Sequence, residues 1–265
     1  MSPKKSAPSK KASIGYQDAG VSIDEADRAV ASIRTMARKT FTSAAGERHN
    51  ILSDFNFSLG AGEVGVFVGP SGCGKSTMLK IVAGLDHDYE GRVARPADAR
   101  IGMVFQEPRL LPWRSVEDNV RLAAPQADEA RLCALFAVLG LSVHRNHFPG
   151  ELSLGLARRV ALARAFAIEP DFLILDEPLA SLDHALAARL RDQIAALVDA
   201  RSVTTLLVTH DVDDAVRLAD RLFLLSPRPA RILAVMPIRT PRGARSEAEI
   251  DAIKSDLAQL NLGTS

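Results

Sequence analysis

Between Gly69 and Ser76 the chain reads Gly-Pro-Ser-Gly-Cys-Gly-Lys-Ser, which fits the P-loop pattern G-x-x-x-x-G-K-[ST]. Glycines let backbone N–H groups converge on phosphate oxygens, and a helix starting here points its positive end at the same anion. Lys75 can reach the β- and γ-phosphates, and the Ser76 hydroxyl can ligate Mg²⁺. We therefore predict a nucleoside-triphosphate site rather than a structural glycine-rich turn. The predicted nucleotide contacts are Gly69, Pro70, Ser71, Gly72, Cys73, Gly74, Lys75, Ser76 and Thr77.

A second segment can supply carboxylates to the same chemistry. The apolar run 172–175 predicts a buried strand that delivers Asp176 to its carboxyl end, where the carboxylate can support Mg²⁺. Glu177 follows, placed to polarise an attacking water as a general base. The alternatives are an aspartate that caps a helix and a glutamate in a solvated turn. The P-loop upstream favours the catalytic roles for both.

The elements that must position these residues alternate between strand and helix. The short apolar run 64–68 predicts a buried strand before the P-loop, and apolar spacing over 78–82 predicts a helix after it. Further strands are expected within 51–59, 89–93, 101–105, 204–208 and 222–225, and further helices over 184–199 and 246–260. This alternation predicts a mostly parallel sheet covered by helices.

Composition narrows the class of protein. The chain has 265 residues, 47% hydrophobic and 25% charged, as is ordinary for a soluble globular protein. The net charge of +1 gives no reason to expect nucleic acid as a partner. There is no apolar run of transmembrane length and no signal-peptide core, so a cytosolic location is expected. Two cysteines, Cys73 and Cys133, predict no disulfide framework.

The order of motifs over about residues 30–230 resembles the nucleotide-binding subunits of ABC transporters. The motifs are a Walker A segment at 69–77, a Q-loop at 104–108, a signature region at 152–165, a Walker B strand at 173–177, a D-loop at 181–183 and an H-loop at His210. The resemblance implies ATP and Mg²⁺ as ligands. It also implies a P-loop NTPase fold of the α/β class, RecA-like, with a mostly parallel sheet, an inserted helical subdomain and an antiparallel β edge.

The resemblance also implies a role for individual residues. Gln106 would contact Mg²⁺ or the lytic water and sense the membrane partner, and His210 would hold the γ-phosphate. Asp183 would link the two sites of a dimer. An aromatic residue upstream of the Walker A segment stacks on adenine in the family, and Phe41 is the candidate here, with a core role as its alternative.

The signature region departs from the family pattern. Leu-Ser-Gly-Gly is replaced by Leu152-Ser153-Leu154-Gly155, which keeps Ser153 and Gly155, the two positions expected to face the γ-phosphate on a partner subunit. Leu154 adds bulk and removes backbone freedom. Either this position needs only ordinary backbone angles or the hydrolysis-competent dimer is weakened. We favour the first alternative.

The sequence thus predicts the ATP-hydrolysing subunit of an ABC importer. The segment from Gln106 to Trp113 most resembles importers of nitrate, sulfonates or taurine, and Trp113 is either a core anchor of the helical insertion or part of the permease groove. Expected partners are transmembrane permease subunits, a second ATP-binding subunit, most simply a copy of this chain, and indirectly a solute-binding protein. The location would be peripheral, on the cytoplasmic face of the cell membrane. The alternative is a non-transport or regulatory ABC-type ATPase with weak hydrolysis.

The expected division of the chain has three parts. A basic and disordered N-terminal tail covers 1–28, with a membrane- or partner-binding basic patch as its alternative. The ATPase domain covers 29–240, with the helical subdomain at about 107–165. A C-terminal tail over 241–265 contains a short amphipathic helix.

Overall fold

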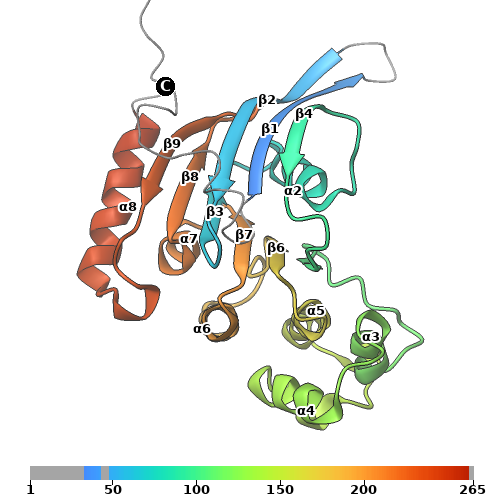
Figure 1. The fold of residues 1–265 in the computed structure, drawn as a ribbon. Helices are drawn as coiled ribbons and strands as arrows, with labels where there is room; N and C mark the ends of the chain where they lie inside the picture. The colour runs from blue at the N-terminus through green and yellow to red at the C-terminus, as the bar shows by residue number, and fades with distance from the viewer. Residues whose placement is uncertain (1–32, 43–47, 263–265) are drawn as a thin grey trace, which may run out of the picture. The chain divides into compact units, whose positions relative to one another are not determined.

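A six-stranded sheet organises the fold (Figure 1). The computed structural model describes residues 33–42 and 48–262, and in 33–42, 48–49 and 261–262 it describes the backbone alone. The strand order is β5-β6-β7-β3-β8-β9, with parallel pairing throughout except for the antiparallel β8–β9 pair at one edge. The predicted α/β class with a mostly parallel sheet and an antiparallel edge is confirmed. The strands are β3 (Val64–Val68), β5 (Ile101–Val104), β6 (Phe172–Asp176), β7 (Thr204–Thr209), β8 (Arg221–Leu225) and β9 (Ile232–Pro237).

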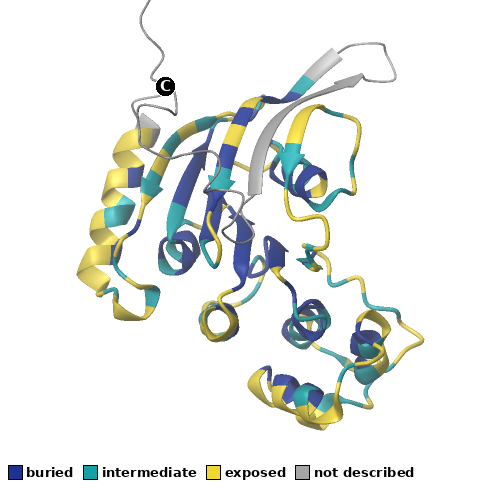
Figure 2. Cartoon of the chain, in the orientation of Figure 1, coloured by how far each residue is buried: buried dark blue, intermediate teal, exposed yellow. Residues whose placement is uncertain are grey.

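The central strands are apolar on both faces because both faces are covered. Every residue of β3, β6 and β7 is buried, which explains their continuous apolar runs (Figure 2). Alternate residues enter two separate cores: Val66 and Leu207 join one, and Phe67 and Leu206 join the other. Helices cover the first core. The helix α2 (Lys75–Ala83) and a second sheet cover the other.

The second sheet has three antiparallel strands in the order β2-β1-β4. Aromatic rings join its inner face to the central sheet: the ring of Phe57 meets Phe67 edge-on at 4.8 Å and Phe223 edge-on at 5.8 Å. This layer holds the P-loop strand from one side. Its strands are β1 (Ile33–Thr42), β2 (Arg48–Leu59) and β4 (Glu90–Ala94).

The expected helical insertion is present between β5 and β6. It contains α3 (Val116–Ala123), α4 (Glu129–Val138), α5 (Leu154–Ala167) and two short 3-10 helices at Ser142–His144 and Pro149–Glu151. Ser115 caps α3 by accepting a hydrogen bond from the Asp118 N–H at 3.1 Å. Trp113 is 70% exposed, which excludes the core anchor, one of the two alternatives for this residue. The buried Asn119 instead holds the preceding loop, by bonding both the N–H and the carbonyl of Leu111.

Three helices complete the chain: α6 (His184–Arg201), α7 (Val212–Leu218) and, after a 3-10 turn at Arg242–Ala244, α8 (Glu247–Leu262). Ser246 and Glu249 form a capping box at the start of the predicted helix, with reciprocal bonds of 3.3 Å. Ile250 and Leu257 of α8 are buried, whereas most of its surface is exposed (Figure 2). Among the residues that the structure describes, no helix is both long and apolar enough to cross a membrane.

Candidate nucleotide site

The parallel strands bring the predicted residues to one edge of the sheet. Gly69 follows β3, Asp176 ends β6, and His210 follows β7. Gln106 comes two residues after β5. Carboxyl ends of parallel strands share one edge, and in open α/β sheets this edge carries the ligand site.

The P-loop turns sharply into α2. Gly74 has φ +124°, and a Cβ there would lie 3.0 Å from Ile51 Cγ2, so a side chain at this position would be strained and crowded. The N-terminus of α2 has no side-chain cap. Its first N–H groups and positive end therefore suit an anion.

Lys75 is buried at the centre of this loop. Its Nζ donates hydrogen bonds to Gly69 O at 2.8 Å and Pro70 O at 3.0 Å, and it lies 3.5 Å from Glu177 Oε1. The cation is thus held within the loop and close to the predicted base. Short movement of a flexible side chain can carry it from these carbonyls to a phosphate.

Ser76 and Asp176 form the pair predicted to hold Mg²⁺. The Ser76 hydroxyl donates to Asp176 Oδ1 at 3.1 Å, and burial raises the pKa of that carboxyl although the serine bond opposes the rise. A hydroxyl and a carboxylate side by side at a phosphate cradle fit Mg²⁺, which takes few protein ligands and completes its shell with water and phosphate oxygens. The described residues contain no cluster of three His, Cys, Asp or Glu that could hold a metal by itself.

Glu177 lies between two partners. One carboxylate oxygen faces Lys75, and the other makes a short contact with His210 Nδ1. Its backbone is left-handed, with φ +48°, and its N–H donates to Val208 O at 3.0 Å. A non-glycine residue in this conformation costs on the order of 1–3 kcal/mol and is found most often at functional sites.

Lys75, Ser76, Glu177 and His210 line one cavity of about 380 Å³ that is open to solvent. Its lining includes Arg228, which the motif reasoning missed as a site residue. The guanidinium stands on the loop after β8, where the bond from Ser226 Oγ to Pro229 O and that from Ala230 N to Ile51 O fix the backbone. The sequence feature that could have identified Arg228 is its position between two prolines, Pro227 and Pro229. The lining residues are Ser71, Gly72, Gly74, Lys75, Ser76, Thr77, Gln106, Glu177, His210 and Arg228.

Ser153, Gly155 and Asp183, the residues expected to act on a partner subunit, do not line this cavity. Ser153 caps α5 and Asp183 caps α6, each by accepting a hydrogen bond from the N–H three residues on. Gly155 is buried, and a Cβ there would lie 2.4 Å from Leu186 Cδ2, so a larger residue would displace the Leu186 side chain of α6. All three stand at the N-terminal ends of helices, away from the P-loop of the same chain.

The remaining predicted residues have other outcomes. Leu154 is the first residue of α5 and is 46% exposed, so this position needs only ordinary helical angles, as the favoured alternative required. Cys73 is buried, and burial raises the pKa of its thiol. The side chain of Phe41, the candidate for adenine stacking, lies outside the described residues.

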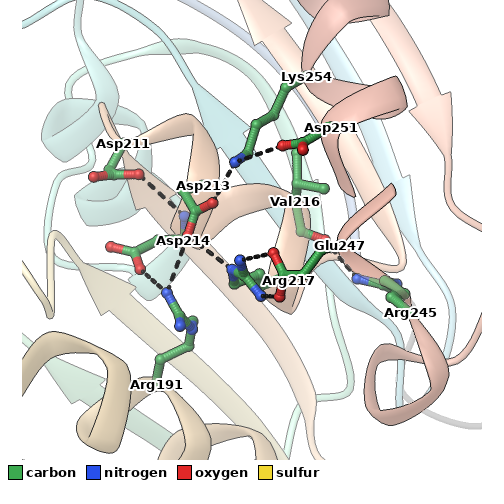
Figure 3. Close-up of polar contacts among 10 residues, drawn as sticks. All are labelled: Arg191, Asp211, Asp213, Asp214, Val216, Arg217, Arg245, Glu247, Asp251 and Lys254. Carbon is green, nitrogen blue, oxygen red and sulfur yellow. Dashed lines mark hydrogen bonds and ion pairs between the residues drawn. The ribbon is translucent and has the colours of Figure 1, made fainter. Parts of the chain in front are cut away.

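Polar contacts tie the helix after His210 to its neighbours (Figure 3). Asp211 caps α7, whose Asp213 and Asp214 both contact Arg191 of α6 at 3.3 and 2.9 Å. Lys254 of α8 reaches Asp213 from the other side at 2.5 Å. Since α6 begins after Asp183, these contacts connect the predicted D-loop and H-loop helices.

Comparison with known proteins agrees with this geometry. The ABC transporter family profile matches residues 52–180. The aliphatic sulfonates import ATP-binding protein SsuB 2 of Pseudomonas syringae pv. tomato is 43% identical over 200 residues, which are 74% of this chain and 86% of the relative. The protein SsuB of Bacillus licheniformis is 39% identical over 201 residues, 72% of this chain and 79% of the relative.

A solved structure is similar as well. It is the dimeric structure of MJ0796, a bacterial ABC transporter cassette, with a TM-score of 0.70, 28% identity, and coverage of 78% of this chain and 99% of that chain. A post-hydrolysis state of the same cassette with ADP and Pi has a TM-score of 0.69. The chain therefore belongs to the ABC transporter family, with the fold of its nucleotide-binding cassettes.

Proposed function

We propose that this chain is the ATP-hydrolysing subunit of an ABC importer and energises a membrane permease. The observation that carries the proposal is the convergence of Lys75, Glu177 and His210 on the P-loop cavity, with the Ser76–Asp176 pair directly beside Lys75. The names of the relatives point to aliphatic sulfonates as the solute class.

The residues divide the chemistry among them. The P-loop N–H groups and Lys75 bind the phosphates, and Glu177 accepts a proton from the attacking water. His210 orients that carboxylate through its Nδ1 contact and faces the γ-phosphate position. Gln106 lines the cavity and positions the water. Mg²⁺, held by Ser76 and Asp176, would neutralise charge on the phosphate oxygens.

A second subunit completes the site in this proposal. Ser153, Gly155 and Asp183 lie outside the cavity of their own chain, and both Ser153 and Asp183 are exposed. The similar cassette MJ0796 is dimeric. We place Ser153 and Gly155 against the γ-phosphate bound by the partner, with Asp183 linking the two sites. ATP binding then closes the dimer, and ATP hydrolysis opens it.

The partners follow from the importer assignment. Permease subunits carry the solute, and a solute-binding protein delivers it from outside, so this subunit lies on the cytoplasmic face of the cell membrane. A regulatory ATPase with weak hydrolysis is disfavoured because Leu154, the residue that motivated it, adopts an ordinary helical position.

The decisive variant is Glu177→Gln in the full-length chain. Loss of the general base should lower kcat roughly 100-fold or more while ATP still drives dimerisation, because the P-loop is intact. Glu169→Gln is the matched control, since Glu169 is also left-handed, at φ +51°, but lies outside the cavity. Steady-state hydrolysis assays measure kcat, and light scattering measures ATP-dependent dimerisation. Unchanged hydrolysis in Glu177→Gln would contradict the assignment of the base.

The solute class needs a separate assay. The chain is reconstituted with its permease and binding protein in liposomes, and uptake of an alkanesulfonate is compared with uptake of nitrate. Faster ATP-dependent uptake of the sulfonate is expected, whereas a preference for nitrate would reject the proposed solute class.

A further inference from the structure

Helix α5 carries two arginines whose guanidinium groups bind main-chain carbonyls of distant loops. Arg158 Nη1 donates to Glu177 O at 3.0 Å and to Pro178 O at 2.7 Å. Arg164 donates through Nη2 to Pro108 O at 2.9 Å and through Nη1 to Arg109 O at 3.0 Å. The first pair of carbonyls follows the Walker B strand, and the second lies in the loop after Gln106.

Each arginine holds the carbonyl of a residue with left-handed backbone. Glu177 has φ +48° and Arg109 has φ +49°. Residues other than glycine seldom adopt this conformation and keep it only where surrounding contacts enforce it. The N–H of Glu177 is held by its hydrogen bond to Val208 O. The carbonyls of Glu177 and Pro178 are held by Arg158. Together they hold the peptide from both sides.

Neither guanidinium has a carboxylate partner within 4 Å among the described side chains. Arg158 is only 6% exposed, and burial lowers the pKa of both arginines. A buried cation is expensive unless it forms strong hydrogen bonds, and bonds from a charged donor are about twice as strong as neutral ones. The two charged guanidinium groups are therefore stabilised by hydrogen bonds to the main-chain carbonyls of the two loops.

We infer that Arg158 and Arg164 are positioning residues, through which α5 holds the Glu177 peptide and the loop after Gln106 in the geometry that hydrolysis requires. The inference rests on the proposed function, because it assigns the two loops to that reaction. It adds a structural connection: Ser153 caps α5, so the helix whose N-terminal end would touch the partner's nucleotide also positions the general base of its own site.

The test compares Arg158→Met and Arg164→Met with Arg201→Met in the full-length chain. Arg201 is the matched control, because its Nη1 also donates to a carbonyl of α5, Phe166 O at 3.3 Å, but it touches neither loop. Misplacement of a catalytic group by about 1 Å can cost roughly 100-fold in rate. We expect kcat to fall about 10- to 100-fold in the first two variants, with KM and the ATP dissociation constant changed less than about threefold. Arg201→Met should retain the wild-type rate.

Two further measurements separate positioning from simple loss of stability. Arg158→Lys keeps the charge and one donor direction and should recover part of kcat, whereas a purely packing role would be restored by methionine as well. Hydrogen exchange should quicken at 177–182 in Arg158→Met and at 106–111 in Arg164→Met, but not in Arg201→Met. The inference would be overturned if the methionine variants kept the wild-type kcat. It would also be overturned if kcat fell and ATP binding weakened by the same factor.

Failure of the proposed function gives a different pattern. A wild-type chain that binds ATP without hydrolysing it would reject the ATPase assignment, while the exchange comparison still decides whether Arg158 and Arg164 hold the two loops. Unchanged exchange at both loops would reject the positioning role even if the ATPase assignment stands.

Discussion

Truncating Leu257 in the C-terminal helix should weaken the attachment of α8 more than removing the exposed ion pair that Glu247 forms. Leu257 is 3% exposed, and Leu260 on the same helix is 40% exposed. Glu247 pairs with Arg217 at 2.6 Å, but the glutamate side chain is 72% exposed. The substitutions Leu257→Ala, Leu260→Ala and Glu247→Gln therefore separate packing from electrostatics on one helix.

The magnitudes decide between the two effects. Leu→Ala in a protein core costs about 2–5 kcal/mol, and a helix at the edge of the molecule places Leu257→Ala near the lower end, at about 2–3 kcal/mol. An exposed ion pair contributes about 0.2–1 kcal/mol. Since 1 kcal/mol shifts Tm by about 2–4 °C in a domain of this size, Leu257→Ala should lower Tm by about 4–12 °C. Both Glu247→Gln and Leu260→Ala should lower it by no more than about 4 °C.

Calorimetry measures these shifts, and hydrogen exchange locates them. Exchange in α7, which follows His210 and packs against α8 through Lys254 and Arg217, should quicken in Leu257→Ala. The effect of Glu247→Gln should shrink as salt is added, and that of Leu257→Ala should not. If Glu247→Gln destabilises as much as Leu257→Ala, or if Leu260→Ala matches Leu257→Ala, then burial does not hold α8 and the reasoning is wrong.

Two substitutions near the nucleotide complete the predictions. Leu154→Gly should leave the ATPase rate within about twofold of wild type, because the residue occupies an ordinary helical position, and a large rise would instead show that Leu154 impairs the site. Arg228→Gln should weaken ATP binding about 3- to 10-fold, since it removes a cation from the cavity lining. Arg231→Gln, on the same loop but outside that lining, is its control, and equal effects in isothermal titration would count against a contact with the nucleotide.

Most elements were predictable because their signals are local. The strand before the P-loop and the Walker B strand are short apolar runs, and the Ser246–Glu249 capping box marks the start of α8. Two strands were not predicted, β1 and β9. Residues of β9 alternate between intermediate and exposed although the segment is apolar throughout, so no alternation of polar and apolar residues marked it as an edge strand.

Trp113 shows where residue type misleads. Tryptophan is usually well buried, and the sequence allowed a core role, but the helical insertion closes its core with smaller side chains and leaves this ring 70% exposed. Burial depends on which face of a loop meets its neighbours, and the short loop after Pro112 has no periodicity from which to deduce that face.

By itself, the sequence determined the chemistry of this protein: the phosphate cradle, the carboxylates at 176 and 177, and the histidine at 210 were all identified from motifs, because each depends on residue type at short spacing. Only the tertiary structure decided how these groups are held. The left-handed peptide at Glu177, its arginine support from α5 and the place of Arg228 join residues far apart in the chain. Such contacts arise from the packing of whole helices against the sheet, which no local pattern encodes.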